Sequence, residues 1–267
     1  KNDMKVSAEN ALKGEVIFPK LDEQRQISDY FRRLDTIITL HQRKCDEIKT
    51  LKKYMLQKMF SQNGEKVPEI RFNGFTEDWE QRKLSDYLSV SGQKNRDEKY
   101  DKEDVLSVSG DYGIVNQIEF QGRSFAGASV TNYGVVETND VVYTKSPLKA
   151  NPYGIIKSNK GKPGIVSTLY AVYHPNDITD SEFVQVYFEQ DARMNSYMHP
   201  LVNKGAKNDM KVSAENALKG EVIFPKLDEQ RQISDYFRRL DTIITLHQRK
   251  CNELKEIKKY MLQNMFV

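Results

Sequence analysis

The sequence begins with KNDMKVSAENALKGEVIFPKLDEQRQISDYFRRLDTIITLHQRKC (residues 1–45), and the same 45 residues recur at 207–251. When residues 1–61 are aligned with 207–267, 55 of the 61 pairs are identical. Solenoid repeats recur every ~20–50 residues and need several copies to share a core. Two copies at an offset of 206 instead predict a duplicated connector on either side of one unique block.

The later part of each copy has the pattern of a long amphipathic helix. No Gly or Pro interrupts Gln24–Phe60 or its repeat Gln230–Phe266, and apolar residues recur at heptad spacing. Typical globular helices run ~8–20 residues, so this length favours a coiled coil over a core helix. We expect a first helix over 24–61 and a second over 230–267, each about 55 Å long at ~1.5 Å per residue.

Two near-identical amphipathic helices in one chain are expected to pack on each other. A compact block between them, with its ends close together, makes the pair antiparallel and gives it a pseudo-twofold axis. The expected interface consists of Ile27, Leu34, Ile37, His41, Ile48 and Met55 from the first helix and Ile233, Leu240, Ile243, His247, Leu254 and Met261 from the second.

The same faces carry His41 with Cys45 and His247 with Cys251, each pair four residues apart. Two His and two Cys that converge can bind zinc. The alternative is a core histidine packed beside a buried thiol, and this spacing is not that of the short zinc motifs. We therefore assign no metal ligands.

The part of each copy before the helix predicts a strand. In the first copy this strand covers Val16–Phe18 and ends at Pro19, which has no backbone donor. Asp22 is a suitable N-cap for the helix that follows. The second copy is expected to supply the closing strand of the unique block, from within 207–229.

The unique block, 62–206, predicts an α/β or α+β domain that extends to residue 229. A short helix is expected from Lys83, and a helical pattern returns at Ser181–Met198. The expected strand runs are Val105–Val108, Gly113–Phe120, Gly134–Val136, Asp140–Tyr143, Gly154–Ile156 and Gly164–Tyr173.

The charge distribution points to one candidate binding region in this block. Residues 62–206 have a net charge of −4, but Val141–Asn176 contains five lysines and no Asp or Glu. Lysines neutralise phosphates, and Asn, Ser and Tyr on loops can reach base edges. The alternative is an ordinary lysine-rich surface. The candidate DNA-binding residues are Arg123, Lys145, Ser146, Lys149, Asn151, Tyr153, Lys157, Lys160, Lys162 and Lys204.

Motifs of catalysis are absent from the sequence. It contains no G-x-G-x-x-G, P-loop or H-E-x-x-H, and no nucleophile–base pair can be proposed. Asn151–Tyr153 (NPY) is similar to the N-P-P-Y motif of amino-methyltransferases but lacks one Pro, so a turn is expected there. The sequence also has no run of 18 apolar residues, and its two cysteines suggest no disulfide framework. We expect a non-enzymatic cytoplasmic protein that does not contact a membrane.

Three segments together resemble type I restriction–modification specificity (S) subunits. FPKLDEQRQI at 18–27 and again at 224–233 resembles the P-x-L-x-E-Q-x-x-I junction between a target recognition domain and a long helix. IRFNGFTEDWEQRKL at 70–84 is similar to the start of such a domain. The resemblance covers essentially the whole chain.

The resemblance implies a DNA-reading subunit without catalysis. In this family two recognition domains each read half of a bipartite double-stranded DNA target, and paired helices set the spacing. The subunit docks two methyltransferase subunits, which bring S-adenosylmethionine, and through them the restriction subunits. No cofactor is expected in this chain.

The sequence departs from the family pattern because it contains one recognition domain instead of two. Residues 1–23 then correspond to the tail of a preceding domain. The chain is expected to be either a fragment of a complete subunit or a rearranged half-subunit, and a half-subunit can form a homodimer. The competing functional class is a coiled-coil scaffold that does not bind DNA, and a third is a methyltransferase that binds S-adenosylmethionine directly.

Overall fold

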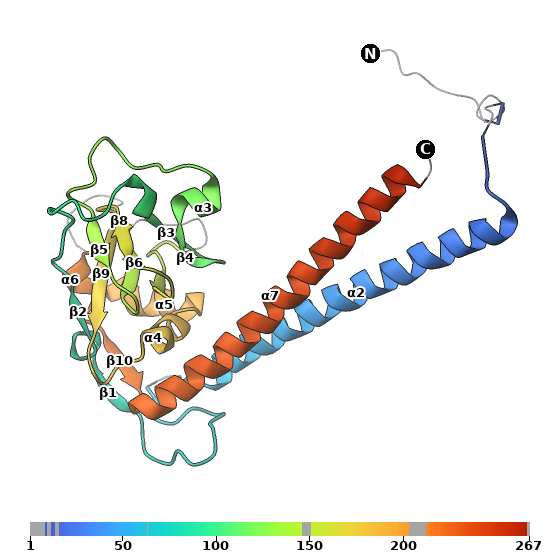
Figure 1. Ribbon diagram of the computed structural model, residues 1–267. Coiled ribbons are helices and arrows are strands. Elements are labelled where there is room, and N and C mark those ends of the chain that lie inside the picture. The colour runs from blue at the N-terminus through green and yellow to red at the C-terminus, as the bar shows by residue number, and fades with distance from the viewer. Residues whose placement is uncertain are drawn as a thin grey trace. The chain divides into compact units, whose positions relative to one another are not determined.

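The computed structural model describes residues 9, 12–13, 16–62, 64–145, 151–202 and 212–265. The chain divides into two compact units, one formed by Lys1–Lys49 with Thr242–Val267 and the other by Thr50–Asp241. We call them the helix unit and the domain unit (Figure 1).

The elements follow one another in the order α2 (Leu21–Lys58), β1 (Glu80–Lys83), η1 (Leu84–Asp86), β2 (Leu88–Val90), η2 (Lys102–Asp104), β3 (Leu106–Ser109), β4 (Gly113–Asn116), α3 (Gln117–Gln121), β5 (Gly134–Val136), β6 (Val141–Thr144), β7 (Ile156–Ser158), β8 (Gly164–Val166), β9 (Tyr170–Pro175), α4 (Ser181–Tyr187), α5 (Asp191–Met198), η3 (His199–Leu201), α6 (Ala214–Ala217), β10 (Glu221–Phe224) and α7 (Leu227–Asn264).

The two long helices form where the repeat predicts them, and each has 38 residues. Both begin three residues earlier than expected and end three residues earlier. Asp22 and Glu23 therefore lie in the first turn of α2, where negative charge is favoured by the helix dipole. The Gln24 side chain donates to the Pro19 carbonyl, which fixes the turn into the helix.

In the helix unit the two helices run antiparallel, as expected. Asp35 of α2 pairs with Lys258 of α7 at 2.5 Å, while further along α2 the His41 Nδ1 lies 2.9 Å from the His247 Nδ1. As the residue number rises in α2, the number of the partner falls in α7. The buried seam residues of this unit are Leu34, Cys45, Ile48, Cys251 and Leu254. Leu34 and Ile48 lie two heptads apart, and Cys45 and Cys251 each lie three residues before the next buried position, as in the heptad pattern of a coiled coil.

Ile37 and Ile243 are corrections to the expected interface. Their side chains keep 43% and 39% of their surface exposed, so both lie outside the buried seam. They occupy the position one residue before the seam positions Ile38 and Ile244, which rotates them about 100° around the helix.

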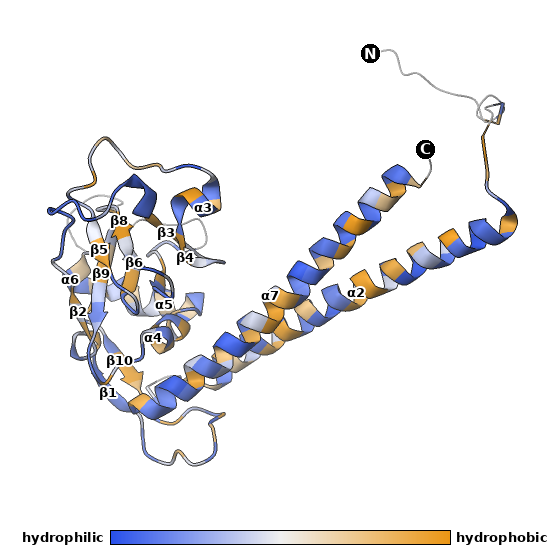
Figure 2. Ribbon diagram, viewed as in Figure 1, coloured by the Kyte–Doolittle hydropathy of each residue, from blue (hydrophilic) through white to orange (hydrophobic). Residues whose placement is uncertain are grey.

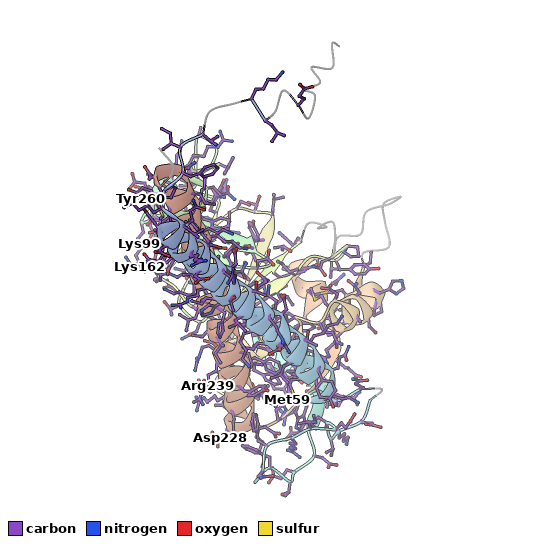
Figure 3. All side chains as sticks on the ribbon, turned by 90° about the vertical axis from the view of Figure 1, so that its right-hand side faces the viewer. Met59, Lys99, Lys162, Asp228, Arg239 and Tyr260 are labelled. Atoms are coloured by element: carbon purple, nitrogen blue, oxygen red, sulfur yellow. The ribbon has the colours of Figure 1, made fainter. Side chains whose placement is uncertain are left out.

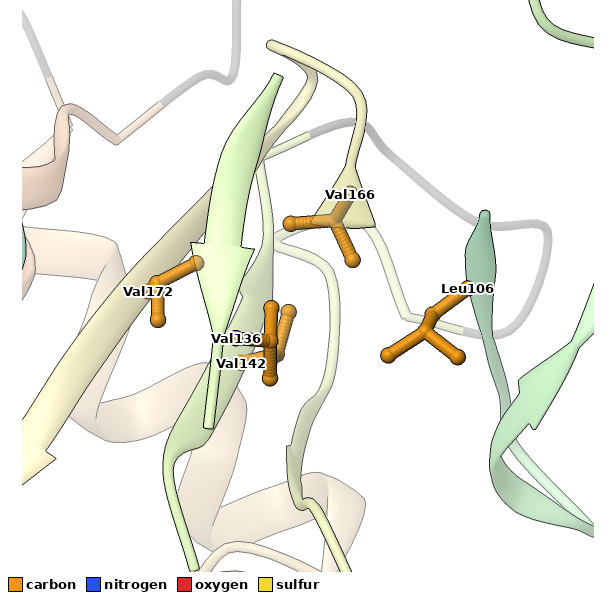
Figure 4. Packing of buried hydrophobic residues seen from close by; sticks show 5 residues of the cluster. All are labelled: Leu106, Val136, Val142, Val166 and Val172. Atoms are coloured by element: carbon orange, nitrogen blue, oxygen red, sulfur yellow. The ribbon is translucent and has the colours of Figure 1, made fainter. Parts of the chain in front are cut away.

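The domain unit is built around a four-stranded antiparallel sheet in the order β2-β9-β6-β7. Two further ribbons, β5–β8 and β3–β4, pack against it. Branched apolar residues from these three groups of strands form one core cluster (Figure 4): Leu106, Val136, Val142, Val166 and Val172. The domain is α+β, within the fold class expected.

A second core of aromatic rings joins the ends of the long helices to the domain. Phe60, just after α2, lies against Trp79 and against Phe237 of α7. Phe183 of α4 contacts both Trp79 and Phe224 of β10. All five rings are almost completely buried. The start of the second repeat is thus part of the core of the domain unit.

The closing strand comes from the second repeat, as expected, because β10 pairs with β1 in an antiparallel ribbon. The corresponding segment of the first repeat differs. Val16–Phe18 is described without a strand, and all three of its side chains are exposed. The expectation of a strand there is wrong for this chain, because a strand needs a neighbour and β1 is already paired with β10.

Several other element boundaries differ from the expected ones. The expected strand Gly113–Phe120 stops at Asn116, whose side chain accepts from two backbone N–H groups and starts α3. The helical pattern of Ser181–Met198 is divided into α4 and α5. The run Gly164–Tyr173 is divided into β8 and β9, and the expected strand at Gly154 starts at Ile156. Lys83 ends β1, and the short helix expected from it is the 3-10 turn η1.

Candidate functional site

The sheet divides the lysine-rich stretch between its two opposite ends. β2 runs antiparallel to β9 and stops opposite Tyr173, whereas β6, also antiparallel to β9, finishes opposite Tyr170, at the end where β9 begins. Lys145 follows β6 there, and its backbone N–H donates to Leu169 O. We call this the Lys145 end. β7 finishes at the other end, which we call the Lys160 end, and the loop after β7 carries Lys160 and Lys162.

A second lysine, which the sequence candidates omit, acts electrostatically on Lys145. Lys94 follows β2 and forms a β-bridge with Gly134 at the start of β5. Its charge acts on Lys145: burial lowers the pKa of Lys145, and repulsion from Lys94 lowers it further, while Glu215 raises it. Lys94 lies in a run of mixed charges, 94–104, and only the strand pairing distinguishes it from its charged neighbours.

Buried hydrogen bonds fix the backbone next to both lysines. Asn95 is fully buried, and its side-chain amide donates to Tyr100 O and Val130 O and accepts from Tyr100 N–H. On the other side, the Tyr143 hydroxyl donates to Tyr153 O at 2.8 Å. The two lysines therefore project from anchored segments.

Asn151 and Tyr153 lie in a tight turn, as expected for the NPY segment. Gly154 N–H donates to Asn151 O, and Gly154 has a φ of +82°. The Tyr153 ring is buried and lies against His199, so it supports the turn and is not presented at the surface. Asn151 is half-buried, and its Oδ1 has no hydrogen-bond partner in the described part of the chain.

Lys157 occupies a different position from the one expected of a phosphate contact. It lies within β7 and is only 8% exposed. Burial lowers the pKa of Lys157, and the charge of Glu189 opposes that shift. Nearby, Lys52 lies 2.6 Å from both Glu189 and Asp241. Lys157 thus belongs to the interior of the domain unit, and we do not retain it as a DNA contact.

The remaining candidates lie at separate places. Lys160 pairs with Glu182 at 3.1 Å, and Lys162 is exposed in the same loop. Arg123 is exposed on the loop after α3, with its guanidinium 4.6 Å from the centre of the Phe125 ring. Ser146, Lys149 and Lys204 lie outside the described residues.

The long helices carry a second set of apolar residues besides the seam. Exposed side chains recur at the same four positions of both repeats: Ile37, Leu40, Leu51 and Tyr54 in α2, and Ile243, Leu246, Ile257 and Tyr260 in α7. Figure 2 shows the apolar residues recurring along both helices, and Figure 3 shows Tyr260 near one end of α7 and Asp228 near the other. We call these sets the α2 stripe and the α7 stripe.

Packing accounts for the His and Cys residues of the seam. The Cys45 and Cys251 Sγ atoms each lie 3.9 Å from a backbone carbonyl of the opposite helix. In the described part of the chain, no three His, Cys, Asp or Glu side chains are grouped so that they could hold a metal ion. Among the same residues, no helix has the length and hydropathy needed to span a membrane.

Comparison with known proteins identifies relatives of this chain in sequence and in fold. Residues 76–256 match the family described as "Type I restriction modification DNA specificity domain". A Methanocaldococcus jannaschii protein, described provisionally as the type I restriction enzyme MjaX specificity subunit, is 22% identical over 263 residues. That alignment covers 91% of this chain but only 56% of the relative, so the chain spans little more than half of the relative's length.

Two solved structures share the fold. The HsdS subunit from Thermoanaerobacter tengcongensis superposes with a TM-score of 0.56 at 19% identity, over 94% of this chain and 60% of that one. The type I restriction-modification S subunit from M. genitalium gives a TM-score of 0.52 at 14% identity, over 93% of this chain and 62% of that one.

Proposed function

Because the chain belongs to the family of type I restriction modification DNA specificity domains, we propose that its domain unit reads one half of a bipartite DNA target. The family match carries this proposal, since it spans the sheet, the closing strand β10 and most of α7. The role is recognition. Methylation and cleavage belong to partner subunits, and S-adenosylmethionine is bound by the methyltransferase partner.

We place the DNA at the Lys145 end of the sheet. Lys145 lies there on anchored backbone, and the half-buried Asn151 belongs to the turn before β7. Lysines supply the charge that holds phosphates, and amide side chains can pair with base edges. Arg123 and Lys162 are exposed and remain candidates for further phosphate contacts.

The α2 and α7 stripes are the proposed docking surfaces for the methyltransferase subunits. Seam residues are covered by the opposite helix, whereas the stripe residues are exposed. Exposed apolar residues that share one helix face are suited to bind a partner helix. The stripes occupy the same positions of the two repeats, so they fit two copies of one methyltransferase partner. Through this partner the chain is linked to the restriction subunits.

The helices also set the spacing between DNA half-sites in this proposal. Each has 38 residues, which corresponds to about 57 Å at ~1.5 Å per residue. Val16–Phe18 repeats the residues that close the domain unit, so it is suited to close a second recognition domain that reads the other half-site. A homodimer of this chain is the alternative source of a second domain.

Base-resolution methylation mapping tests the proposal. In cells that carry the intact system, residues 62–206 are replaced by the corresponding block of an unrelated family member. We expect one half of the methylated sequence to change, while the other half and the spacing stay the same. An unchanged methylated sequence would contradict the proposal and favour the scaffold that does not bind DNA.

A further inference from the structure

One lysine of α2 joins both long helices to the α4–α5 segment of the domain unit. The Lys52 Nζ lies 2.6 Å from Asp241 of α7 and 2.6 Å from Glu189, which lies in the turn between α4 and α5. The Lys52 side chain is 11% exposed and the Glu189 side chain 25%, and all three residues belong to the domain unit. This contact therefore connects three elements at one largely buried point.

The repeat shows which part of this contact belongs to the helix pair itself. Lys258 and Asp35, the repeat equivalents of Lys52 and Asp241, form the same interhelical pair in the helix unit. Among the described residues Lys258 forms an ion pair with Asp35 alone, and its side chain is 30% exposed. Glu189 is thus the group that the domain unit adds to a pair that the two helices form without it.

The α4–α5 segment makes two more contacts with the end of α2. Arg193 of α5 donates to Leu56 O at 3.2 Å, and its guanidinium lies 4.7 Å from the centre of the Phe60 ring. Lys52 and Leu56 are about one turn apart on α2, and Phe60 follows four residues later, so the three share one side. The last turns of α2 are therefore held at three consecutive points.

Buried ion pairs select one arrangement more strongly than they stabilise the fold. The cost of removing charges from water offsets much of their attraction, but a shift that separates the partners leaves a buried charge without compensation. Burial acts to lower the pKa of Lys52, but the charges of Glu189 and Asp241 outweigh it and the pKa is raised, so the lysine stays protonated. Among the described residues Glu189 forms its ion pair with Lys52 alone, and its Oε2 is buried without a hydrogen-bond partner. Sliding α2 along the domain would leave this carboxylate unpaired.

We propose that Glu189 and Lys52 are positioning residues that fix the number of base pairs between the two DNA half-sites. This inference rests on the proposed function and names the contact that sets the spacing. One base pair adds ~3.4 Å to a duplex, which is about the length of two helical residues at ~1.5 Å each. A shift of that size along α2 would place the domain over a half-site one base pair away.

Base-resolution methylation mapping of the intact system in cells tests this role. Glu189→Gln keeps the size of the side chain and removes its charge, and Lys52→Met keeps the apolar stem. Lys258→Met is the matched control, because it removes the equivalent lysine from a pair that Glu189 does not join. We expect both test variants to methylate additional sites whose spacer is one base pair longer or shorter, with the half-site sequences unchanged. The control should keep the wild-type spacer.

Thermal unfolding separates positioning from stability. The test variants should melt within ~3 °C of the wild type, because the buried pair contributes little net stability. A single spacer length in both test variants, or equal relaxation of the spacer in Lys258→Met, would overturn the role of Glu189. A large fall in melting temperature with one spacer length would mean that the contact only stabilises the fold.

Pulsed electron paramagnetic resonance gives a readout that does not depend on DNA. Spin labels at Lys53→Cys and Val90→Cys report the distance between α2 and β2, and both positions are exposed within the domain unit. The native cysteines are buried, so the labels attach to the introduced ones. We expect a broader distance distribution in Glu189→Gln and Lys52→Met than in the wild type and Lys258→Met.

The two readouts distinguish failure of this inference from failure of the proposed function. If the distribution broadens but the wild type methylates no bipartite sequence, the contact holds α2 in place and the proposed function fails. If the wild type methylates a bipartite sequence and neither readout changes in the test variants, the positioning role alone is wrong.

Discussion

At the scale of single residues, the seam of the helix unit contains one polar contact between identical side chains. The Nδ1 atoms of His41 and His247 lie 2.9 Å apart, and these residues occupy the same position of the repeat. In a pair of neutral rings, one Nδ1 must donate and the other must accept. Removing one ring leaves the other with a half-buried nitrogen and no partner across the seam, whereas removing both leaves an apolar contact.

This pair predicts a non-additive double mutant. His41→Leu and His247→Leu should each lower the free energy of unfolding by about 1–2 kcal/mol. The double variant should lose less than either single variant, because no ring nitrogen is then left unpaired. Urea unfolding of the three variants measures this coupling, and a loss in the double variant equal to the sum of the single losses would show that the contact contributes nothing.

A second residue-scale prediction concerns the turn beside Lys145. A Cβ on Gly154 would lie 1.9 Å from Thr144 O, and the φ of +82° disfavours any side chain. Gly154→Ala should therefore lower the free energy of unfolding by about 2–4 kcal/mol. Gly127→Ala is the control, because a Cβ there meets nothing within 4 Å. Thermal unfolding that gives the same melting temperature for both variants would contradict the turn geometry.

At the scale of elements, the repeat places one sequence in two environments. Phe224 in β10 is fully buried, whereas Phe18, its equivalent in the first repeat, is 72% exposed. The next part of the repeat shows the same contrast. Glu229 is buried and makes a two-point pair with Arg71, both distances being 2.7 Å, whereas Glu23 is exposed. Local sequence permits the strand and the helix start, and the presence of a neighbouring domain decides whether they are buried.

Phe224→Ala and Phe18→Ala form a matched pair of variants. The first removes a buried ring and should cost about 3–5 kcal/mol of stability. The second should change stability by less than about 0.5 kcal/mol. Urea unfolding of both variants checks the contrast, and similar losses would mean that Phe18 is covered in solution.

The stripes predict a separation of folding from docking. Ile243→Glu with Leu246→Glu should leave the helical circular dichroism and its melting temperature near wild type, since both side chains are exposed. Binding to the methyltransferase subunit of the same system should fall by at least tenfold, as measured by calorimetry. Leu254→Glu is the contrasting variant, because Leu254 is buried in the seam and charge there should unfold the helix pair. Unchanged methyltransferase binding by the stripe variant would exclude this surface.

The helices and the closing strand were predictable because their signals are local. Heptad spacing from Leu34 to Ile48 and the absence of Gly and Pro predict a long helix without knowledge of its partner. The candidate site was less predictable, because the sheet decides which lysines meet. All three residues of β7 are buried, Lys157 included, and the sheet places Lys145 and Lys160 at opposite ends although both belong to one lysine-rich stretch.

At the scale of the whole molecule, the two kinds of surface have different proposed tasks. The domain unit has a net negative unique block, so bulk charge does not explain DNA binding, and local clusters such as the Lys145 end must supply it. The stripes are apolar and would be insensitive to salt. DNA binding should therefore depend steeply on salt, whereas docking of the methyltransferase subunit should not.

Equilibrium DNA binding by the 267-residue chain, measured as a function of salt, tests the central claim most directly. A duplex that contains the methylated sequence of the system is titrated at salt concentrations from ~50 to ~200 mM. We predict a linear fall of log Kobs with log salt, with a slope of about −2 or steeper, as expected for at least two phosphate contacts. An affinity that does not change over this range, or no binding at the lowest salt, would contradict the account.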